Sequence, residues 1–301
     1  MALSNARVHY HIAGGTKTSM DRTDWAELSE PVRHAITAYT GPVLSAETAS
    51  DGLNSAIAMS VRTSTNTIFV KGLRTDHPGV VTQHREAMIN PYVLSVSPRL
   101  RWHIDDVDGW NLLGFDYIPG RHADYRPGSP DLPKVIAAMR RLGQIPCPDL
   151  PIKQAEKRWA DYVDDSMDLE CLRGDALLHT DYNPLNILIY DRGAHIIDWA
   201  WPTRGAAFID PACLILRLIA AGHTPTQAET SVAQAPAWNQ ASKRAIDIFA
   251  VANSRLWRQI ATNDPHPWKT HMAAVVDQWA QHRLYGRHSH RTPALQPARA
   301  G

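Results

Sequence analysis

The sequence predicts an α+β protein with two lobes, in which an antiparallel sheet precedes a larger helical part. Apolar residues alternate with polar ones at 56–61 and 67–71, which indicates a β-hairpin. From residue 132 onward the apolar residues recur instead at helical spacing. The chain of 301 residues is longer than one hydrophobic core usually serves, so we expect two packed lobes.

The small lobe is expected to contain two helices and one mostly antiparallel sheet of five strands. The first helix covers 25–39 and stops at Gly41-Pro42, because glycine and proline favour a helix end. The second helix covers 78–90 and stops before Pro91. Besides the two strands of the hairpin, short apolar runs predict strands at 94–96, 101–104 and 111–117.

The large lobe is expected to be mainly helical after a turn at 126–130. Helical spacing is found at 132–142, 152–163, 211–221, 241–262 and 271–284. The resulting domain prediction is a loose tail, a small lobe, a large lobe and a frayed second tail, with the bounds 1–22, 23–116, 117–286 and 287–301.

Composition argues against nucleic acid and anionic membranes as partners. The chain has 31 basic and 30 acidic residues, a net charge of +1, so a small molecule is the expected partner and no protein partner is evident. Three cysteines without close spacing predict neither a disulfide framework nor a zinc site, which fits a reducing cytoplasm. The start of the chain lacks the apolar core of a secretion signal. The most apolar later run, 212–222, is too short to cross a bilayer.

The segment from His179 to Asn186, followed by Asp198, carries the chemistry that the sequence suggests. Two β-branched runs at 186–190 and 194–198 flank Asp191-Arg192-Gly193, which predicts a hairpin. Asn186 and Asp198 would then lie nearly opposite one another, about 5 Å apart between backbones. One amide and one carboxylate suit Mg²⁺, which prefers oxygen ligands. The carboxylate of Asp181, just upstream, would remain to accept a proton.

These residues resemble a known family. The pattern His179-x-Asp181-x-x-x-x-Asn186, with Asp198-Trp199 downstream, resembles the catalytic loop and metal-binding aspartate of the aminoglycoside phosphotransferase family. The resemblance implies a bilobal, protein-kinase-like fold whose larger lobe carries the catalytic hairpin. It further implies that Asp181 is the catalytic base and that Asn186 and Asp198 hold Mg²⁺. The histidine at this position is expected to support the loop.

The resemblance continues upstream and implies an ATP site. Lys71, within Phe69-Val70-Lys71-Gly72-Leu73, resembles the lysine that holds the ATP phosphates, and Glu86 resembles the glutamate that pairs with it. The segment 114–120 resembles the hinge whose backbone grips adenine. Its expected contacts are Asp116, Tyr117 and Ile118.

The expected phosphate loop departs from the protein-kinase pattern. The segment 50–55 has one glycine where G-x-G-x-x-G would be usual. Gly52, Asn54 and Ser55 are nevertheless predicted to contact phosphate, since the antibiotic kinases often use serine or asparagine there. The alternative is a plain turn before the next strand.

The residues after Asp198 favour a small-molecule acceptor. Only eleven residues separate Asp198 from Asp210, too few for a peptide-binding activation segment. Asp210 itself resembles the aspartate that anchors the catalytic loop. The segment 240–285 has only three acidic residues, which argues against a classical aminoglycoside. Two other groups are either acceptor-binding or structural: the acidic residues Asp161, Asp164, Asp165, Asp168 and Glu170, and the tryptophans Trp199, Trp201, Trp238, Trp257, Trp268 and Trp279.

Together these patterns predict an ATP-dependent phosphotransferase that moves the γ-phosphate to a hydroxyl of a small molecule, such as an antibiotic, a sugar or another metabolite. A pseudokinase that binds nucleotide without turnover is the first alternative. A metal-dependent phosphohydrolase using His179, Asp181 and Asp198 as ligands is the second, and it would accept zinc where a kinase site favours Mg²⁺.

Overall fold

The computed structural model describes residues 22–50 and 55–286, and its contacts divide the chain into two compact units. The first unit is Met1–His122 with Leu188–Trp201, and the second is Ala123–Ile187 with Pro202–Gly301. The division therefore lies a few residues after the expected boundary at 116/117. Residues 188–201 belong to the first unit, to which they are joined by contacts that include the hydrogen bond from the Ile196 N–H to Val96 O, 2.7 Å away.

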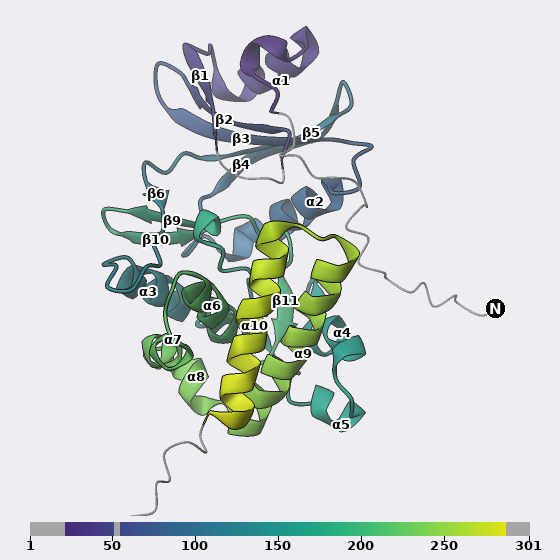
Figure 1. Cartoon of the computed structure of the whole chain (residues 1–301). Helices are drawn as coiled ribbons and strands as arrows, with labels where there is room; N and C mark the ends of the chain where they lie inside the picture. Colours follow the sequence, from purple (N-terminus) through teal and green to yellow (C-terminus); the bar gives the residue numbers. More distant parts are fainter. Residues whose placement is uncertain (1–21, 51–54, 287–301) are drawn as a thin grey trace, which may run out of the picture. The chain divides into compact units, whose positions relative to one another are not determined.

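The first unit is built on a five-stranded antiparallel sheet, as predicted (Figure 1). Its order is β1-β2-β3-β5-β4. The expected hairpin at 56–61 and 67–71 is formed by β2 and β3, and the expected strands at 101–104 and 111–117 are β4 and β5. The bounds are β1 Ser45–Thr48, β2 Ile57–Arg62, β3 Thr67–Arg74, β4 Leu100–Val107 and β5 Trp110–Asp116.

One of the five predicted strands was wrong. The run 94–96 forms turns after the short 3₁₀ helix Asn90–Tyr92, and the fifth strand is β1, which is more polar. Val93 and Val96 are fully buried, and the Val96 N–H donates to Val93 O at 2.9 Å. The apolar run therefore contributes buried side chains to the core from a turn and not from a strand. Strand β1 pairs with β2 at the edge of the sheet.

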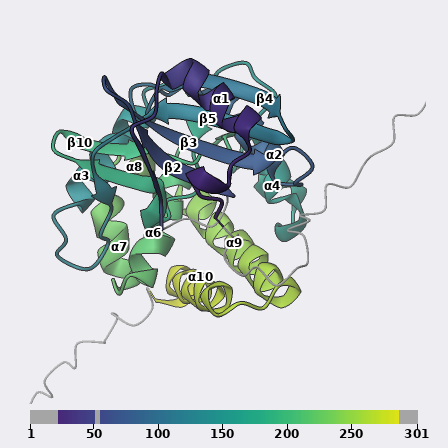
Figure 2. The ribbon, with the colours of Figure 1, turned by 90° about the horizontal axis from the view of Figure 1, so that it is seen from above.

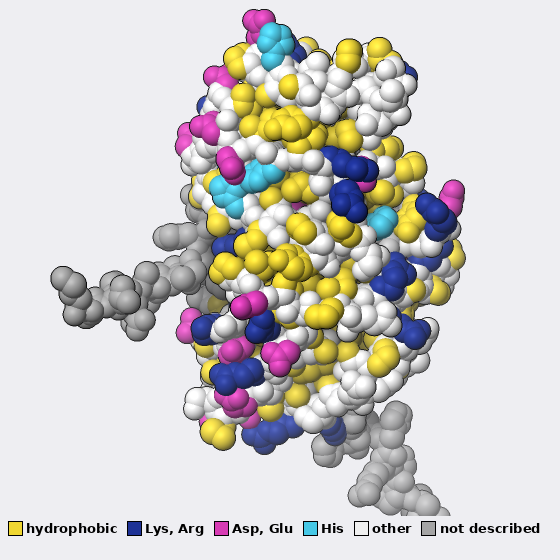
Figure 3. Space-filling view, turned by 180° about the vertical axis from the view of Figure 1, so that it is seen from behind, with side chains coloured by type: hydrophobic (Ala, Val, Ile, Leu, Met, Phe, Trp, Pro, Cys, Tyr) yellow, Lys and Arg dark blue, Asp and Glu magenta, His cyan; other side chains and the backbone are white. Residues whose placement is uncertain are grey.

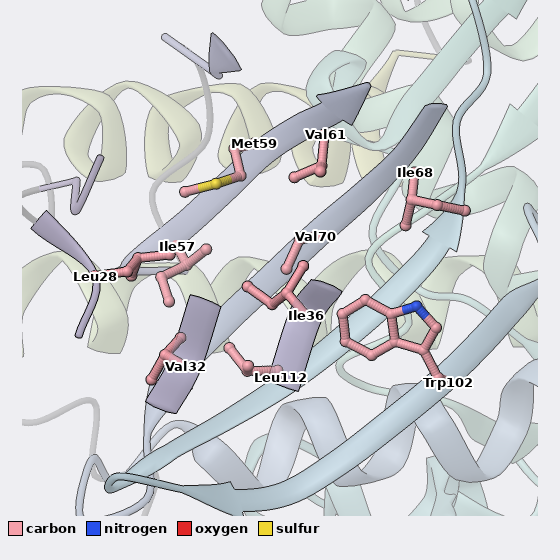
Figure 4. Close-up of a cluster of buried hydrophobic side chains, with 10 residues drawn as sticks. All are labelled: Leu28, Val32, Ile36, Ile57, Met59, Val61, Ile68, Val70, Trp102 and Leu112. Carbon is pink, nitrogen blue, oxygen red and sulfur yellow. The ribbon is translucent and has the colours of Figure 1, made fainter. Parts of the chain in front are cut away.

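The first predicted helix is interrupted. A 3₁₀ helix, Trp25–Glu27, precedes α1, Glu30–Thr40, because Leu28 and Ser29 have extended backbone angles and Pro31 lies at the start of α1. Helix α1 lies over the sheet (Figure 2), and ends at Gly41 with φ 82°, a conformation that favours glycine. Its apolar face packs with strand side chains in the cluster of Figure 4: Leu28, Val32, Ile36, Ile57, Met59, Val61, Ile68, Val70, Trp102 and Leu112.

Helix α2, Val80–Ile89, packs against β3 and β5 and confirms the helix predicted at 78–90. The 3₁₀ helix that follows includes Pro91, which cannot continue an α-helix. The hairpin expected at 186–198 is present, with β9, Ile187–Tyr190, and β10, Gly193–Ile196. It was expected in the larger lobe, but its residues from Leu188 onward belong to the first unit. Strand β6, Arg121–His122, pairs with β9.

The second unit is mainly helical, as predicted. Helices α9 and α10 pack along each other (Figure 1), and α6 contacts both. Helices α7 and α8 were not predicted, because their short segments lack a long apolar repeat. The bounds are α3 Leu132–Leu142, α6 Ile209–Ala220, α7 Pro225–Val232, α8 Pro236–Gln240, α9 Lys243–Asn263 and α10 Pro267–Tyr285.

The helix predicted at 152–163 is wrong as a continuous element. The segment forms β7, Lys153–Gln154, then α4, Ala155–Arg158, and a 3₁₀ turn at Ala160–Tyr162. Strand β7 pairs in parallel with β11, Thr203–Gly205, which also pairs with β8, Ala176–Leu178. These sheet hydrogen bonds override the helical spacing of the sequence.

None of the helices at 22–50 or 55–286 has the length and apolar character that a membrane span requires. The three cysteines are free thiols, and Cys213 is buried.

Candidate active site

Three charged side chains of the first unit meet at one point. Lys71 on β3 places its Nζ 2.7 Å from Glu86 Oε2 on α2 and 3.1 Å from Asp198 Oδ1 after β10. The Glu86 and Lys71 side chains are 6% and 14% exposed, so the ion pairs are largely shielded from water. The predicted pairing of Lys71 with Glu86 is therefore present, and Asp198 joins it.

The buried carboxylates keep Lys71 protonated. Burial alone would lower the pKa of Lys71, but the nearby charges of Asp198 and Glu86 outweigh it and raise this pKa above its ordinary value. Burial has the opposite effect on the acid and raises the pKa of Glu86, while the ammonium of Lys71 works against that rise. A permanent cation beside two carboxylates can position anionic phosphate oxygens.

The backbone around Asp198 is held in an unusual conformation. Asp198 has φ 63°, a left-handed angle that non-glycine residues adopt at a cost. The next residue, Trp199, is 1% exposed and fixes the turn through its backbone N–H to Glu86 Oε1 at 3.4 Å and its Nε1 to Ile196 O at 3.2 Å. Glu86 therefore holds both Lys71 and the Asp198-Trp199 turn.

The predicted adenine and phosphate segments are only partly described. Asp116 ends β5, where its N–H donates to Arg99 O and its carboxylate pairs with Arg101. Tyr117 and Ile118 follow in irregular backbone, and Tyr117 is 42% exposed.

In the predicted phosphate loop, Gly52 and Asn54 lie outside the described residues. Ser55 is 5% exposed, and its carbonyl accepts from Arg22. These contacts to nucleotide remain predictions.

The segment 179–186, predicted to be the catalytic loop, lies in the second unit, and Asp181 makes several of its hydrogen bonds. Asn186 Nδ2 donates to Asp181 Oδ2 at 3.1 Å and to Asp181 O at 3.3 Å. The Asn183 N–H donates to Asp181 Oδ1 at 3.2 Å. The Asp181 side chain is 39% exposed, so it is oriented yet accessible. Asn186 uses its amide nitrogen in these bonds, and the group it can offer a metal is its carbonyl oxygen.

Asp210 on α6 anchors this loop by accepting hydrogen bonds from it, as the sequence predicted. Its carboxylate accepts from the backbone N–H groups of His179 at 3.0 Å and Thr180 at 2.8 Å, and from the Tyr182 hydroxyl at 3.2 Å. Thr180 has φ 68°, which is strained for a β-branched residue. Burial raises the pKa of Asp210, and the hydrogen bonds that it accepts oppose that rise.

His179 supports the loop rather than facing outward. The side chain is 2% exposed, and its Nδ1 accepts from the Asp181 N–H at 3.3 Å. This arrangement agrees with the supporting role expected for His179.

Arg217 was not identified as a site residue, although it stands two helical turns after Asp210 on α6. Its Nη2 donates to Asp181 Oδ1 at 2.9 Å, and its guanidinium lies 5.9 Å from the ring centre of Trp257. Trp257 in turn meets Trp268 edge to face, with ring centres 6.1 Å apart. The sequence signal that could have found Arg217 is a single charged residue within the apolar run 212–222.

The acidic group at 161–170 is largely paired with arginines. Asp164 makes a two-point ion pair with Arg255, and Asp168 contacts Arg244 at 2.5 Å. Both pairs line a cavity of about 500 Å³. Asp165 caps the short helix α5, Ser166–Leu169, by accepting from the Met167 N–H. These contacts favour the structural interpretation of this group.

The tryptophans divide into buried residues and residues in contact with charged or aromatic side chains. Trp199, Trp238 and Trp279 are at most 8% exposed and belong to the core. Trp201 stacks with Arg85. Trp257 contacts Arg217, and Trp268 contacts Trp257. Trp268 is 43% exposed.

The predicted site residues thus form two groups. Lys71, Glu86 and Asp198 meet in the first unit, and Asp181 and Asn186 meet in the second. The expected facing of Asn186 and Asp198 joins residues of different units and remains a prediction. Each group offers oxygen ligands of the kind that Mg²⁺ prefers.

Solved structures share this fold, although no family model and no curated protein matches the sequence. The choline kinase LicA from Streptococcus pneumoniae has a TM-score of 0.60 and 15% identity, covering 83% of this chain and 98% of that chain. A provisionally assigned aminoglycoside phosphotransferase from Ralstonia eutropha has a TM-score of 0.55 and 11% identity, covering 86% and 98%. A provisionally assigned fructosamine-3-kinase from Haemophilus somnus has a TM-score of 0.54 and 10% identity, covering 83% and 96%.

The chain therefore has the kinase-like α+β fold of these structures, and the fold implied by the motif resemblance is confirmed. Identities of this size establish the fold alone.

We expect the Asp210→Ala substitution to lower the free energy of unfolding by about 2–4 kcal/mol, because buried donors of the catalytic loop lose their acceptor while the cost of burying a carboxylate is removed. Urea unfolding measures this change. The control is Asp191→Ala, which removes an exposed carboxylate from the β9–β10 turn and should change stability by less than about 0.5 kcal/mol. Equal stability of the two variants would contradict the anchoring role.

Proposed function

We propose that this protein is a small-molecule kinase that transfers the γ-phosphate of ATP to a hydroxyl group. The observation that carries the proposal is the Lys71–Glu86–Asp198 cluster, in which Glu86 is buried and Lys71 and Asp198 are 14% and 23% exposed. Taking charges out of water is costly, so the cluster is better explained by function than by stability. A catalytic loop with an oriented, accessible carboxylate supplies the second requirement of the reaction.

In the first unit, Lys71 would hold phosphate oxygens of the nucleotide. Glu86 fixes the direction of the Lys71 side chain and the turn that carries Asp198. Tyr117 and Ile118 would contact the adenine through their backbone, together with Asp116 through its carbonyl oxygen. Gly52, Asn54 and Ser55 would cover the phosphates.

In the second unit, Asp181 would accept the proton of the acceptor hydroxyl. Asn186 and Arg217 hold its carboxylate from two sides, and Asp210 fixes the backbone beneath it. A base held in this way is prepared for proton transfer without a large rearrangement.

The chain has suitable ligands for Mg²⁺. Asp198 offers a carboxylate and Asn186 an amide oxygen, and neither is a nitrogen or sulfur ligand that would favour zinc. When bound, Mg²⁺ would bridge phosphate oxygens and offset the negative charge that develops during transfer.

The surroundings of Asp181 favour a neutral or anionic acceptor. Arg217 already places a cation against Asp181 and against the face of Trp257, two places where a cationic amine would bind. The acidic residues of α9 and α10 are also neutralised, since Asp247 pairs with Arg283, Asp264 with Lys269 and Asp277 with Arg258. A polycation would therefore meet little uncompensated negative charge there.

The two alternatives have less support. A phosphohydrolase would use His179 as a metal ligand, whereas its Nδ1 accepts from the loop backbone and its ring is 2% exposed. A pseudokinase would not need the charged groups of both units, all of which this chain retains.

The acceptor proposal predicts the outcome of a screen that measures ADP formation from MgATP. Hydroxylated compounds are tested in three groups, neutral, anionic and polycationic. We expect turnover with a neutral or anionic compound and none above background with aminoglycosides, because Arg217 repels added positive charge. Turnover confined to polycations would contradict this acceptor class.

Once an acceptor is identified, we expect the Asp181→Ala variant to lose about 10²–10⁴-fold in kcat, the usual contribution of a general base. MgATP binding, measured by calorimetry, should change little, because Asp181 is assigned to the acceptor hydroxyl. Asp191→Ala is the matched control and should keep native kcat. An active Asp181→Ala enzyme would exclude Asp181 as the base.

A further inference from the structure

Two histidines and an aspartate that the proposed function does not use converge on the surface of the first unit. His103 Nε2 on β4 lies 3.2 Å from Asp105 Oδ1, and His84 Nε2 on α2 lies 3.9 Å from the same oxygen. The three ligand atoms lie within 4.8 Å of one another. Figure 3 shows histidine side chains gathered beside acidic ones at the molecular surface.

A buried amide completes the cluster. Asn111 on β5 is fully buried, and its Nδ2 lies 2.9 Å from His103 Nε2 and 3.1 Å from His84 Nε2. Its Oδ1 is buried without a hydrogen-bond partner. A half-turn of the amide would exchange the two atoms and direct this oxygen toward both imidazoles, with the loss of the 3.3 Å hydrogen bond that Nδ2 donates to Asp105 O.

We propose that His84, His103 and Asp105 form a binding site for a divalent transition metal, with Zn²⁺ as the preferred ion. Two imidazole nitrogens and a carboxylate are ligands of the kind that zinc takes in proteins, and imidazole disfavours Mg²⁺ and Ca²⁺. A flipped Asn111 would place its oxygen beside the ion.

The distances fit this ion. Zinc bonds of about 2.0–2.1 Å in a tetrahedron place neighbouring ligand atoms about 3.3 Å apart. The separation of His103 from Asp105 is close to this value, and that of His84 from Asp105 exceeds it by less than 1 Å. The two imidazole nitrogens lie within 4.8 Å of one another, and the exposed side chain of His84 would have to turn toward the ion. The Asp105 side chain is 84% exposed, so it can rotate to close the difference.

Occupation of the site would join helix α2 to strand β4. His84 lies two residues before Glu86, whose carboxylate holds Lys71 and the Asp198-Trp199 turn. A metal bound at His84 would therefore restrain the helix that positions Glu86. This consequence depends only on contacts within the first unit.

The test is calorimetric titration of the full chain with Zn²⁺ after treatment with a chelator. We expect His84→Ala and Asp105→Asn to weaken one Zn²⁺ binding event by at least about tenfold, since each loses a ligand. The matched control is His34→Ala, which removes an exposed histidine 3.8 Å from Glu30 on α1 and should leave the titration unchanged. Mg²⁺ titrated in place of Zn²⁺ should give no binding event that these variants alter.

Comparing the native and variant titrations also distinguishes Zn²⁺ binding at this site from Zn²⁺ binding at other histidines. His9, His11, His288 and His290 lie outside the described residues, and binding to them would persist equally in native and variant chains. Asp105→Asn keeps the size of an exposed side chain, and its circular dichroism and thermal midpoint without metal verify its fold. Superimposable Zn²⁺ titrations of the native chain, His84→Ala and Asp105→Asn would overturn the proposal.

Hydrogen exchange provides a second test, because a metal bound at His84 should restrain helix α2. Zn²⁺ should slow hydrogen exchange of the α2 amides in the native chain and leave exchange unchanged in Asp105→Asn. Equal exchange of α2 in both chains at saturating Zn²⁺ would also overturn the proposed site.

Discussion

The organisation of the first unit depends on the buried ammonium of Lys71. It joins β3 to α2 through Glu86 and to the turn after β10 through Asp198, a residue 127 positions away in the sequence. Removing one partner of such a buried pair usually costs about 3–5 kcal/mol, because the other charge stays buried. The pairing therefore constrains where α2 lies and which conformation Asp198 adopts. The left-handed angle of Asp198 is held by the same contacts.

In the second unit, helix α6 carries the two residues that hold the Asp181 carboxylate and its loop in place. Asp210 and Arg217 lie about two turns apart on α6 and therefore on one face. Asp210 holds the backbone of the catalytic loop, and Arg217 holds the Asp181 carboxylate. The apolar remainder of α6 is buried, so both polar residues are fixed by a rigid element. In each unit, charged contacts hold in place a carboxylate to which the proposed function assigns a role, Asp198 in the first and Asp181 in the second.

Sequence patterns predicted the long elements and the pairing of Lys71 with Glu86. The hairpin β2–β3 and helices α3, α6, α9 and α10 have extended apolar repeats, and each is present. The errors at 94–96 and 152–163 arise where contacts with distant segments decide the local structure. Lys71 and Glu86 could be paired through the family resemblance. Arg217 could not be placed, because its contact with Asp181 depends on how α6 packs beneath the loop.

Thermal unfolding can establish whether Asp198 belongs to a MgATP site. A ligand that binds only the folded state at a hundredfold excess over Kd stabilises it by about 2.7 kcal/mol. We expect MgATP to raise the Tm of the native chain, the rise to be smaller without Mg²⁺, and the Asp198→Ala variant to show no rise. No rise at millimolar MgATP, or an equal rise in Asp198→Ala, would rule out Asp198 as part of a MgATP site.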